Sequence, residues 1–289
     1  MASIVQRITV PRFQQRKRST EGKPLVVVTA YDAPQGRLAD SAGVDAILVG
    51  DSLAMTTLGY DSTLPVTLDD LVRHTAAVAC GMESRSAQKP TPEDTERGAR
   101  HALLIADMPF GTYGASVEEG VRAGMRLVSE GKAQSVKLEG AGEINLETIR
   151  RLVAIGVPVM GHLGMTPQSI HRFGGFRVQG KSDDAADAVL REAEALVDAG
   201  VFSIVLELVP AQLAERITAA IPVPTIGIGA GPGCDGQVQV LHDLLGLTPG
   251  PALRHARQYA NLGETITQAL AQYAREVRQG KFPTEENSF

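Results

Sequence analysis

The chain has 289 residues, and its 28 lysines and arginines against 33 aspartates and glutamates give a formal net charge of −5. Hydrophobic residues make up 43% of the chain and charged residues 21%, which is typical of a folded globular protein and argues against wholesale disorder. The acidic balance argues against broad binding to nucleic acid or to an anionic membrane, and no apolar run approaches the roughly 20 residues that cross a bilayer.

Eight short apolar runs recur in chain order, and most of them precede a longer segment with helical periodicity. The runs cover residues 25–30, 46–50, 102–106, 135–138, 157–161, 203–206, 224–228 and 238–241. Near-continuous valine, isoleucine and leucine without alternation is typical of strands that are buried on both faces. The predicted amphipathic helices cover residues 34–42, 68–79, 117–130, 146–155, 183–199 and 211–219, with one or two closing helices in 253–279.

The alternation of strand and helix favours a parallel α/β protein. Eight such units in fewer than 300 residues favour a closed (β/α)8 TIM barrel, which we predict as one domain over residues 1–289 with an N-terminal extension and C-terminal helices. Residues 81–100 break the rhythm because they are polar and contain two prolines and many charges, so we predict a loop insertion there.

The two cysteines, Cys80 and Cys234, are too few for a disulfide scaffold, and neither lies in a CxxC pair. The N-terminal residues lack the apolar segment of a secretory signal. Together these features predict a cytoplasmic protein in a reducing compartment.

Carboxylates lie at the ends of three predicted strands. Asp51 follows ILVG, Asp107 follows LLIA, and Glu139 comes at the end of SVKLE. In a TIM barrel these strand ends converge on one face, where active sites are built. Carboxylate oxygens without a Cys/His cluster suit Mg²⁺, so we predict a magnesium site; helix capping or an ion pair at each strand end is the alternative.

Three further polar side chains belong to the same predicted mouth. Lys137 shares a strand face with Glu139, and it either contacts an anionic substrate or pairs with that glutamate. Glu207 lies between IVL and LVP, where burial should raise its pKa toward neutrality, as a general base requires; a structural pairing is the alternative. His162 either donates to a substrate oxygen or is a hydrogen-bonded histidine at a strand end.

A series of motifs carries a family resemblance. They are GDSLAM (50–55), DSTLPVT (61–67), ADMPF (106–110), VKLEG (136–140), GHLGMTPQS (161–169), GGFRVQGK (174–181), VLELVP (205–210), PTIGIGAG (224–231) and DGQVQVLHDLLGL (235–247). With these motifs the chain resembles the ketopantoate hydroxymethyltransferases over residues 8–283. The resemblance implies a barrel of the pyruvate/phosphoenolpyruvate-type group and a homo-oligomer, often a decamer.

The resemblance also implies an activity and a role for each site residue. Such enzymes transfer a hydroxymethyl group from 5,10-methylenetetrahydrofolate to 3-methyl-2-oxobutanoate, giving 2-dehydropantoate and tetrahydrofolate in the first step of pantothenate and coenzyme A synthesis. The implied Mg²⁺ ligands are Asp51, Asp107 and Glu139. The implied contacts to the keto acid come from Asp51, Ser52, Asp107, Lys137 and His162. Glu207 is the implied proton acceptor, which forms an enolate that Mg²⁺ stabilises.

The sequence departs from the family pattern in three places. Ala54 stands where glycine is usual, which would cost about 1 kcal/mol if that position needs a positive φ. Tyr60 stands where histidine is common, and segment 81–96 is longer than usual. None of these changes removes a catalytic group. From the residues alone, two alternatives stay open: a C–C bond lyase of the same barrel group, and a non-catalytic barrel that binds a keto acid.

Overall fold

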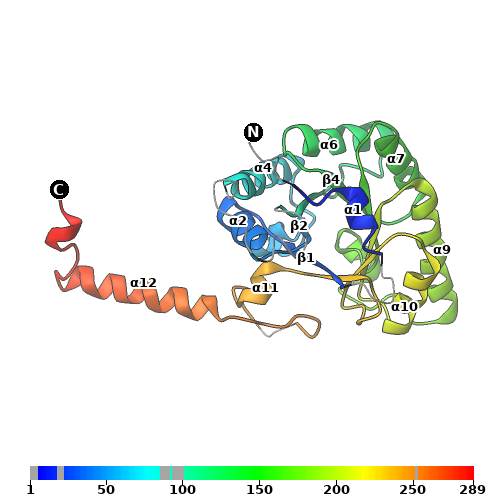
Figure 1. Cartoon of the computed structure of the whole chain (residues 1–289). Coiled ribbons are helices and arrows are strands. Elements are labelled where there is room, and N and C mark those ends of the chain that lie inside the picture. The colour runs from blue at the N-terminus through cyan, green and yellow to red at the C-terminus, as the bar shows by residue number, and fades with distance from the viewer. Residues whose placement is uncertain (1–5, 18–22, 85–91, 93–100, 251–252) are drawn as a thin grey trace. The chain divides into compact units, whose positions relative to one another are not determined.

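Eight parallel strands pair in chain order and close into a barrel in the computed structural model of the chain (Figure 1). The strands are β1 (Leu25–Thr29), β2 (Ala46–Val49), β3 (Leu103–Asp107), β4 (Ser135–Glu139), β5 (Val159–Gly164), β6 (Ser203–Glu207), β7 (Thr225–Ile228) and β8 (Gly236–Gln239). The barrel closes because β8 pairs in parallel with β1, from Leu25 opposite Gly236 to Val28 opposite Gln239. The predicted TIM barrel is confirmed.

The structure describes residues 6–17, 23–84, 92, 101–250 and 253–289. The chain divides into two compact units, residues 1–239 and 240–289, and each unit is described by itself. The first unit contains the barrel. The prediction of one domain over residues 1–289 stays a prediction.

Helices alternate with the strands in the first unit. They are α1 (Val10–Gln14), α2 (Ala33–Ser41), α3 (Leu53–Thr56), α4 (Leu68–Ser84), α6 (Val117–Ser129), α7 (Glu143–Ala154), α8 (Ile170–Phe173), α9 (Asp183–Ala199) and α10 (Ala211–Ala220). Several begin at a polar side chain that accepts a hydrogen bond from the first turn: Asp32 caps α2, Ser116 caps α6, and Ser182 caps α9. Local sequence therefore sets where these helices start.

The inward-facing side chains of the strands form a core inside the barrel. This core contains Leu25, Val27, Leu48, Leu103, Ile105, Met160, Val205, Ile226 and Val238. The N-terminal extension adds Phe13 of α1, which is fully buried and meets Phe202 edge to face with 5.9 Å between ring centroids. Polar groups thus lie beyond this core, at the strand ends.

The second unit contains α11 (Leu241–Leu245), α12 (Leu262–Arg278) and a short 3₁₀ helix, η3 (Glu285–Asn287). No residue of α12 is buried, although its sequence is amphipathic. None of the helices in the described ranges combines the length and the apolar character needed to cross a bilayer.

Several predicted boundaries need correction. The eighth strand begins at Gly236 and ends at Gln239, because Leu241 already starts α11. The predicted insertion 81–100 starts too early, since α4 continues to Ser84; most of its remainder lies outside the described residues. The closing helix is a single helix that begins at Leu262, and the residues described before it, from Leu253 on, are not helical.

Candidate active site

Ionisable side chains gather where five neighbouring strands, β2 to β6, reach their carboxyl ends. We call this set the strand-end cluster; it consists of Asp51, Asp107, Lys137, Glu139, His162 and Glu207. All of them are buried except Glu207, whose side chain is 14% exposed. Because parallel strands all point the same way, their carboxyl ends share one face of the barrel. The structure brings together every ionisable residue that the sequence predicts for the site.

Two aspartates form one side of the strand-end cluster. Asp51 lies in the turn after β2, where the GDSLAM motif continues into α3. Its backbone N–H donates to Oδ2 of Asp107, the last residue of β3, over 2.9 Å. The neighbouring Ser52 hydroxyl lies 2.8 Å from the hydroxyl of Tyr31. The two predicted metal ligands with aspartate side chains are therefore direct neighbours.

Lys137 places an ammonium group inside the strand-end cluster. Its Nζ lies 3.0 Å from Oδ1 of Asp107 and 3.2 Å from Nδ1 of His162. Burial alone would lower the lysine pKa, but the carboxylates of Asp107, Glu139 and Asp51 raise it overall. Lys137 is therefore charged at neutral pH, and its ion-pair partner is Asp107. The pairing with Glu139 was one of the two alternatives that the sequence left open.

His162 lies between the two glutamates. Its Nδ1 is 3.3 Å from Oε1 of Glu139, and its Nε2 is 3.2 Å from Oε2 of Glu207, close but not well aligned for a hydrogen bond. Burial, followed by the charge of Lys137, lowers the pKa of the imidazole, so the ring is neutral at pH 7. The ammonium of Lys137 can only donate, so Nδ1 accepts and the ring proton is on Nε2, facing Glu207.

Negative charge exceeds positive charge in this buried space, where four carboxyl groups face one ammonium. Burial, with added repulsion from Asp107 and Glu139, raises the pKa of Asp51 well above its ordinary value. Burial also raises the pKa of Glu139 to about 7 and raises the pKa of Glu207. The strand-end cluster is thus suited to a bound cation and to a carboxylate that accepts a proton near neutral pH.

The carboxylates have oxygens that suit a divalent cation. Oε1 of Glu139 is buried and accepts no hydrogen bond, and Oδ1 of Asp107 is buried in its ion pair with Lys137. Within the described part of the chain, no three His, Cys, Asp or Glu side chains are already arranged as metal ligands. Mg²⁺ needs few protein ligands, because it keeps water and takes substrate oxygens. The residues present therefore fit Mg²⁺ bound by one or two carboxylates.

Sequence reasoning missed two uncharged residues of the site, Gln168 and Tyr113. The side-chain NH₂ of Gln168 donates to Oδ2 of Asp51 over 2.8 Å, and the hydroxyl of Tyr113 accepts from the backbone N–H of Glu139 over 3.0 Å. Neither residue is charged at neutral pH, so neither stands out at a strand end. The available signal was the position of Gln168 in the GHLGMTPQS motif, six residues after His162.

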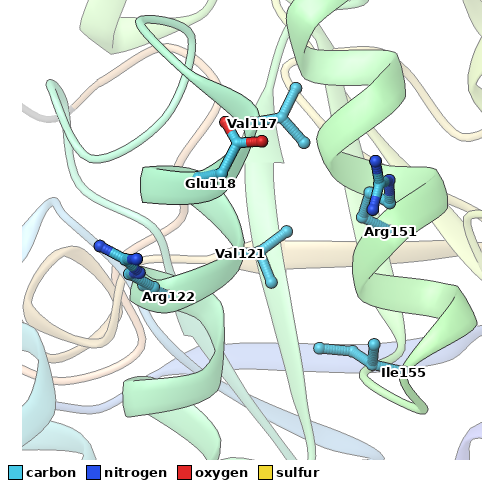
Figure 2. Close-up of a pocket in the computed structure, with 6 residues that line it drawn as sticks. All are labelled: Val117, Glu118, Val121, Arg122, Arg151 and Ile155. Carbon is cyan, nitrogen blue, oxygen red and sulfur yellow. The ribbon is translucent and has the colours of Figure 1, made fainter.

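A pocket on the outside of the barrel is separate from this chemistry (Figure 2). It lies between α6 and α7, has a volume of about 210 Å³, and is lined by Val117, Glu118, Val121, Arg122, Arg151 and Ile155. None of these residues belongs to the strand-end cluster. We therefore place the candidate active site at the strand ends.

Comparison with known proteins identifies the relatives of this chain. A family model described as ketopantoate hydroxymethyltransferase matches residues 7–89 and 91–285. A 3-methyl-2-oxobutanoate hydroxymethyltransferase of Moorella thermoacetica is 52% identical over 98% of each chain. The enzyme of the same name from Roseiflexus is also 52% identical, over 98% of this chain and 94% of the relative.

Solved structures of more distant proteins share the fold. A phosphoenolpyruvate phosphomutase from Streptomyces platensis matches with a TM-score of 0.56 and 14% identity, covering 94% of this chain and 88% of that one. A 2,3-dimethylmalate lyase, a member of the PEP mutase/isocitrate lyase superfamily, matches with a TM-score of 0.55 and 15% identity, covering 99% and 93%. At this identity the likeness concerns the barrel architecture alone.

Proposed function

The chain belongs to the ketopantoate hydroxymethyltransferase family, and we propose that it transfers a hydroxymethyl group from 5,10-methylenetetrahydrofolate to 3-methyl-2-oxobutanoate. The products are 2-dehydropantoate (ketopantoate) and tetrahydrofolate. This is the first step of pantothenate and coenzyme A synthesis. The reaction needs a base that removes the hydrogen on C3 of the keto acid, and the strand-end cluster offers one.

The position of Glu207 is the main support for this proposal. Its side chain is 14% exposed, so a substrate can reach it, while burial still raises its pKa. The main chain around it is fixed: its C=O accepts the N–H of Met165 over 2.8 Å, and the following Leu208 has a positive φ of 46°. A leucine in this region is strained, which is common beside catalytic groups.

The other residues of the strand-end cluster would hold the metal and the keto acid. Asp51 and Asp107 would hold Mg²⁺, with Glu139 as a direct or water-mediated ligand. When bound, Mg²⁺ supplies Lewis-acid polarisation of the substrate oxygens and so acidifies the C3 hydrogen. The Lys137 ammonium offsets the charge of the substrate carboxylate, and the Ser52 hydroxyl is a further donor near Asp51.

Proton transfer then involves Glu207 and His162. Oε2 of Glu207 accepts the proton from C3, while the neutral imidazole of His162 keeps its own proton on Nε2, 3.2 Å from that oxygen. The electron pair left on C3 forms the bond to the one-carbon unit. That unit leaves the folate nitrogen and takes its hydroxyl oxygen from water. The base is therefore needed before the folate takes part.

Exchange of the C3 hydrogen of 3-methyl-2-oxobutanoate in deuterated water, followed by NMR, tests this function without folate. We expect exchange that requires Mg²⁺, and we expect Glu207→Gln to abolish it while keto-acid binding persists. Glu192→Gln, on the outer helix α9, is the matched control and should exchange normally. Exchange at the wild-type rate in Glu207→Gln would remove Glu207 from this role, and no exchange in the wild type would contradict the proposed function.

A further inference from the structure

Gln168 is a buried polar residue that has no part in the proposed hydroxymethyl transfer as described so far. It lies in the short 3₁₀ helix η2 (Pro167–Ser169) in the loop that follows β5, and only 8% of its surface is exposed. Its side chain reaches from this loop into the strand-end cluster. A buried amide needs a partner for each of its polar atoms, so its contacts show what it can do there.

The contacts of Gln168 join three other strands. Its backbone N–H donates to Oε2 of Glu139 over 3.0 Å. Its side-chain NH₂ donates to Oδ2 of Asp51 over 2.8 Å and to the backbone C=O of Met108 over 3.1 Å. Gln168 thus forms hydrogen bonds with residues at the ends of β2, β3 and β4. Two of its three acceptors are proposed ligand carboxylates, those of Asp51 and Glu139.

Tyr113 fixes the direction of the Gln168 amide. Its hydroxyl donates to Oε1 of Gln168 over 2.7 Å and accepts the N–H of Glu139 over 3.0 Å. A reversed amide would place Oε1 against the backbone C=O of Met108, which can only accept, and would lose the donor to Oδ2 of Asp51. The network therefore permits one orientation, in which the NH₂ group faces Asp51.

These donors act on carboxylates that repel each other. Asp51, Asp107 and Glu139 are all buried, and the Gln168 side chain supplies one of them, Asp51, with a hydrogen-bond donor over 2.8 Å. Each carboxylate keeps its second oxygen available, because Gln168 donates only to Oδ2 of Asp51 and Oε2 of Glu139. The arrangement is that of a residue behind the ligands, orienting them from the side away from the metal.

We infer that Gln168 is a positioning residue, which holds Asp51 and Glu139 ready for a divalent cation and the keto acid, with Tyr113 holding the amide in its working orientation. This inference rests on the proposed function, because it needs these carboxylates to act as ligands. According to this inference, Gln168 in the loop after β5 affects metal affinity, although neither Gln168 nor Tyr113 is itself a ligand of the metal.

Metal binding tests this inference without turnover. We expect Gln168→Met, which keeps the length of the side chain but removes its NH₂ donor to Asp51, to weaken Mn²⁺ binding by about 10- to 100-fold, as followed by electron paramagnetic resonance. The backbone N–H that donates to Glu139 stays in this variant. Tyr113→Phe keeps the buried ring and loses only the hydroxyl, so it should weaken binding in the same direction by a smaller factor. This second variant serves if Gln168→Met fails to fold.

Gln134→Met is the matched control. Oε1 of Gln134 accepts the backbone N–H of Leu104 over 3.0 Å near the start of β3, so this change also removes a glutamine hydrogen bond but leaves the strand-end cluster intact. We expect it to lower thermal stability without changing Mn²⁺ affinity. A purely structural Gln168 would behave in the same way as this control.

The outcomes separate this inference from the proposed function. Weaker Mn²⁺ binding in both site variants, with a raised KM for the keto acid in the steady state, supports the inference. Wild-type Mn²⁺ affinity in a folded Gln168→Met or Tyr113→Phe protein overturns it and leaves the proposed function standing. A wild-type protein that binds no Mn²⁺ and exchanges no C3 hydrogen overturns both.

Discussion

Ala54 occupies a position in the GDSLAM motif where the family resemblance leads us to expect glycine. In the structure it lies inside α3 and is fully buried, and its N–H donates to the C=O of Asp51 over 2.9 Å. Among the described residues other than glycine, those with positive φ are Lys132 and Leu208. The backbone at Ala54 therefore suits any L-residue. The cost of about 1 kcal/mol, which would apply only at a positive φ, does not arise.

We accordingly expect Ala54→Gly to destabilise the protein. Glycine in a helix is less favourable than alanine by about 1 kcal/mol, and the buried methyl group is lost as well. Urea unfolding of the two proteins measures the difference, and C3 hydrogen exchange checks that the site is unchanged. A more stable glycine variant would mean that the alanine is strained after all.

Most of the site residues that could be predicted from the sequence are those whose side chains carry a charge. Asp107 and Glu207 stand out because a carboxylate within or directly after an apolar run is costly to bury without a purpose. Gln168 and Tyr113 carry no charge, and their partners come from elements far away in sequence. Hydrogen bonds of this kind form only once the barrel has closed, so no local sequence pattern could predict them.

At the scale of the element, α4 begins with a reciprocal pair of caps. The hydroxyl of Thr67 accepts the N–H of Asp70 over 3.2 Å, and Oδ2 of Asp70 accepts the N–H of Thr67 over 3.0 Å. This is a capping box with aspartate in the third position. The hydrogen bonds from Thr67 lower the pKa of Asp70, so the cap is strongest when that carboxyl is ionised.

Two substitutions test this cap. We expect Thr67→Ala to lower the free energy of unfolding by roughly 1 kcal/mol. Asp70→Asn should also destabilise at pH 7. Because the folded-state pKa of Asp70 is depressed, its contribution is complete above the unfolded-state pKa of about 3.9 and is lost as the pH falls through the folded-state value. The deficit of Asp70→Asn in urea unfolding should therefore shrink as the pH is lowered; a constant deficit would refute this linkage.

Elements were predictable where one physical signal dominates. Six strands match their apolar runs to within one residue at each end, because most of their residues are buried and few polar residues interrupt them. The run at 157–161 was placed too early, since β5 extends from Val159 to Gly164. The run at 238–241 misplaced β8, since that strand starts with Gly236 and Gln237 and the apolar residues continue into α11. The short helices α1 and α3 were missed because four or five residues hold too few turns to show a helical period.

At the scale of the molecule, we propose that copies of this chain form a homo-oligomer, a decamer as the family resemblance implies. One feature of α12 supports self-association. Its apolar side chains recur on one face and stay exposed by 43% to 62%; they are Ile266, Leu270, Tyr273 and Val277. An exposed apolar stripe of this kind favours burial against another surface.

We expect Leu270→Glu to reduce the oligomer size measured by light scattering, because it places a charge in the middle of this stripe. Gln268→Glu adds the same charge on the opposite face of α12 and should leave the size unchanged. An unchanged oligomer in Leu270→Glu would exclude this stripe from the contact between copies. A wild-type monomer would contradict the oligomer itself.

The excess negative charge of the strand-end cluster also has a consequence for the whole molecule. A cation that binds the folded chain alone stabilises it by about 2.7 kcal/mol at a concentration of 100 Kd. For a chain of 289 residues this corresponds to a rise in Tm of roughly 4 to 5 °C. We expect Mg²⁺ to produce such a rise at constant ionic strength, with NaCl as the reference salt.

Asp107→Asn should reduce this Mg²⁺-dependent rise by more than half, since it removes the negative charge of one proposed ligand. Asp187→Asn is the matched control, because Asp187 lies on the surface, with Oδ1 2.7 Å from Arg216, and plays no part in the strand-end cluster. Differential scanning calorimetry measures all three proteins. An equal rise in the wild type and in Asp107→Asn would mean that the ion binds elsewhere, because a ligand stabilises the fold only through the site that the unfolded chain lacks.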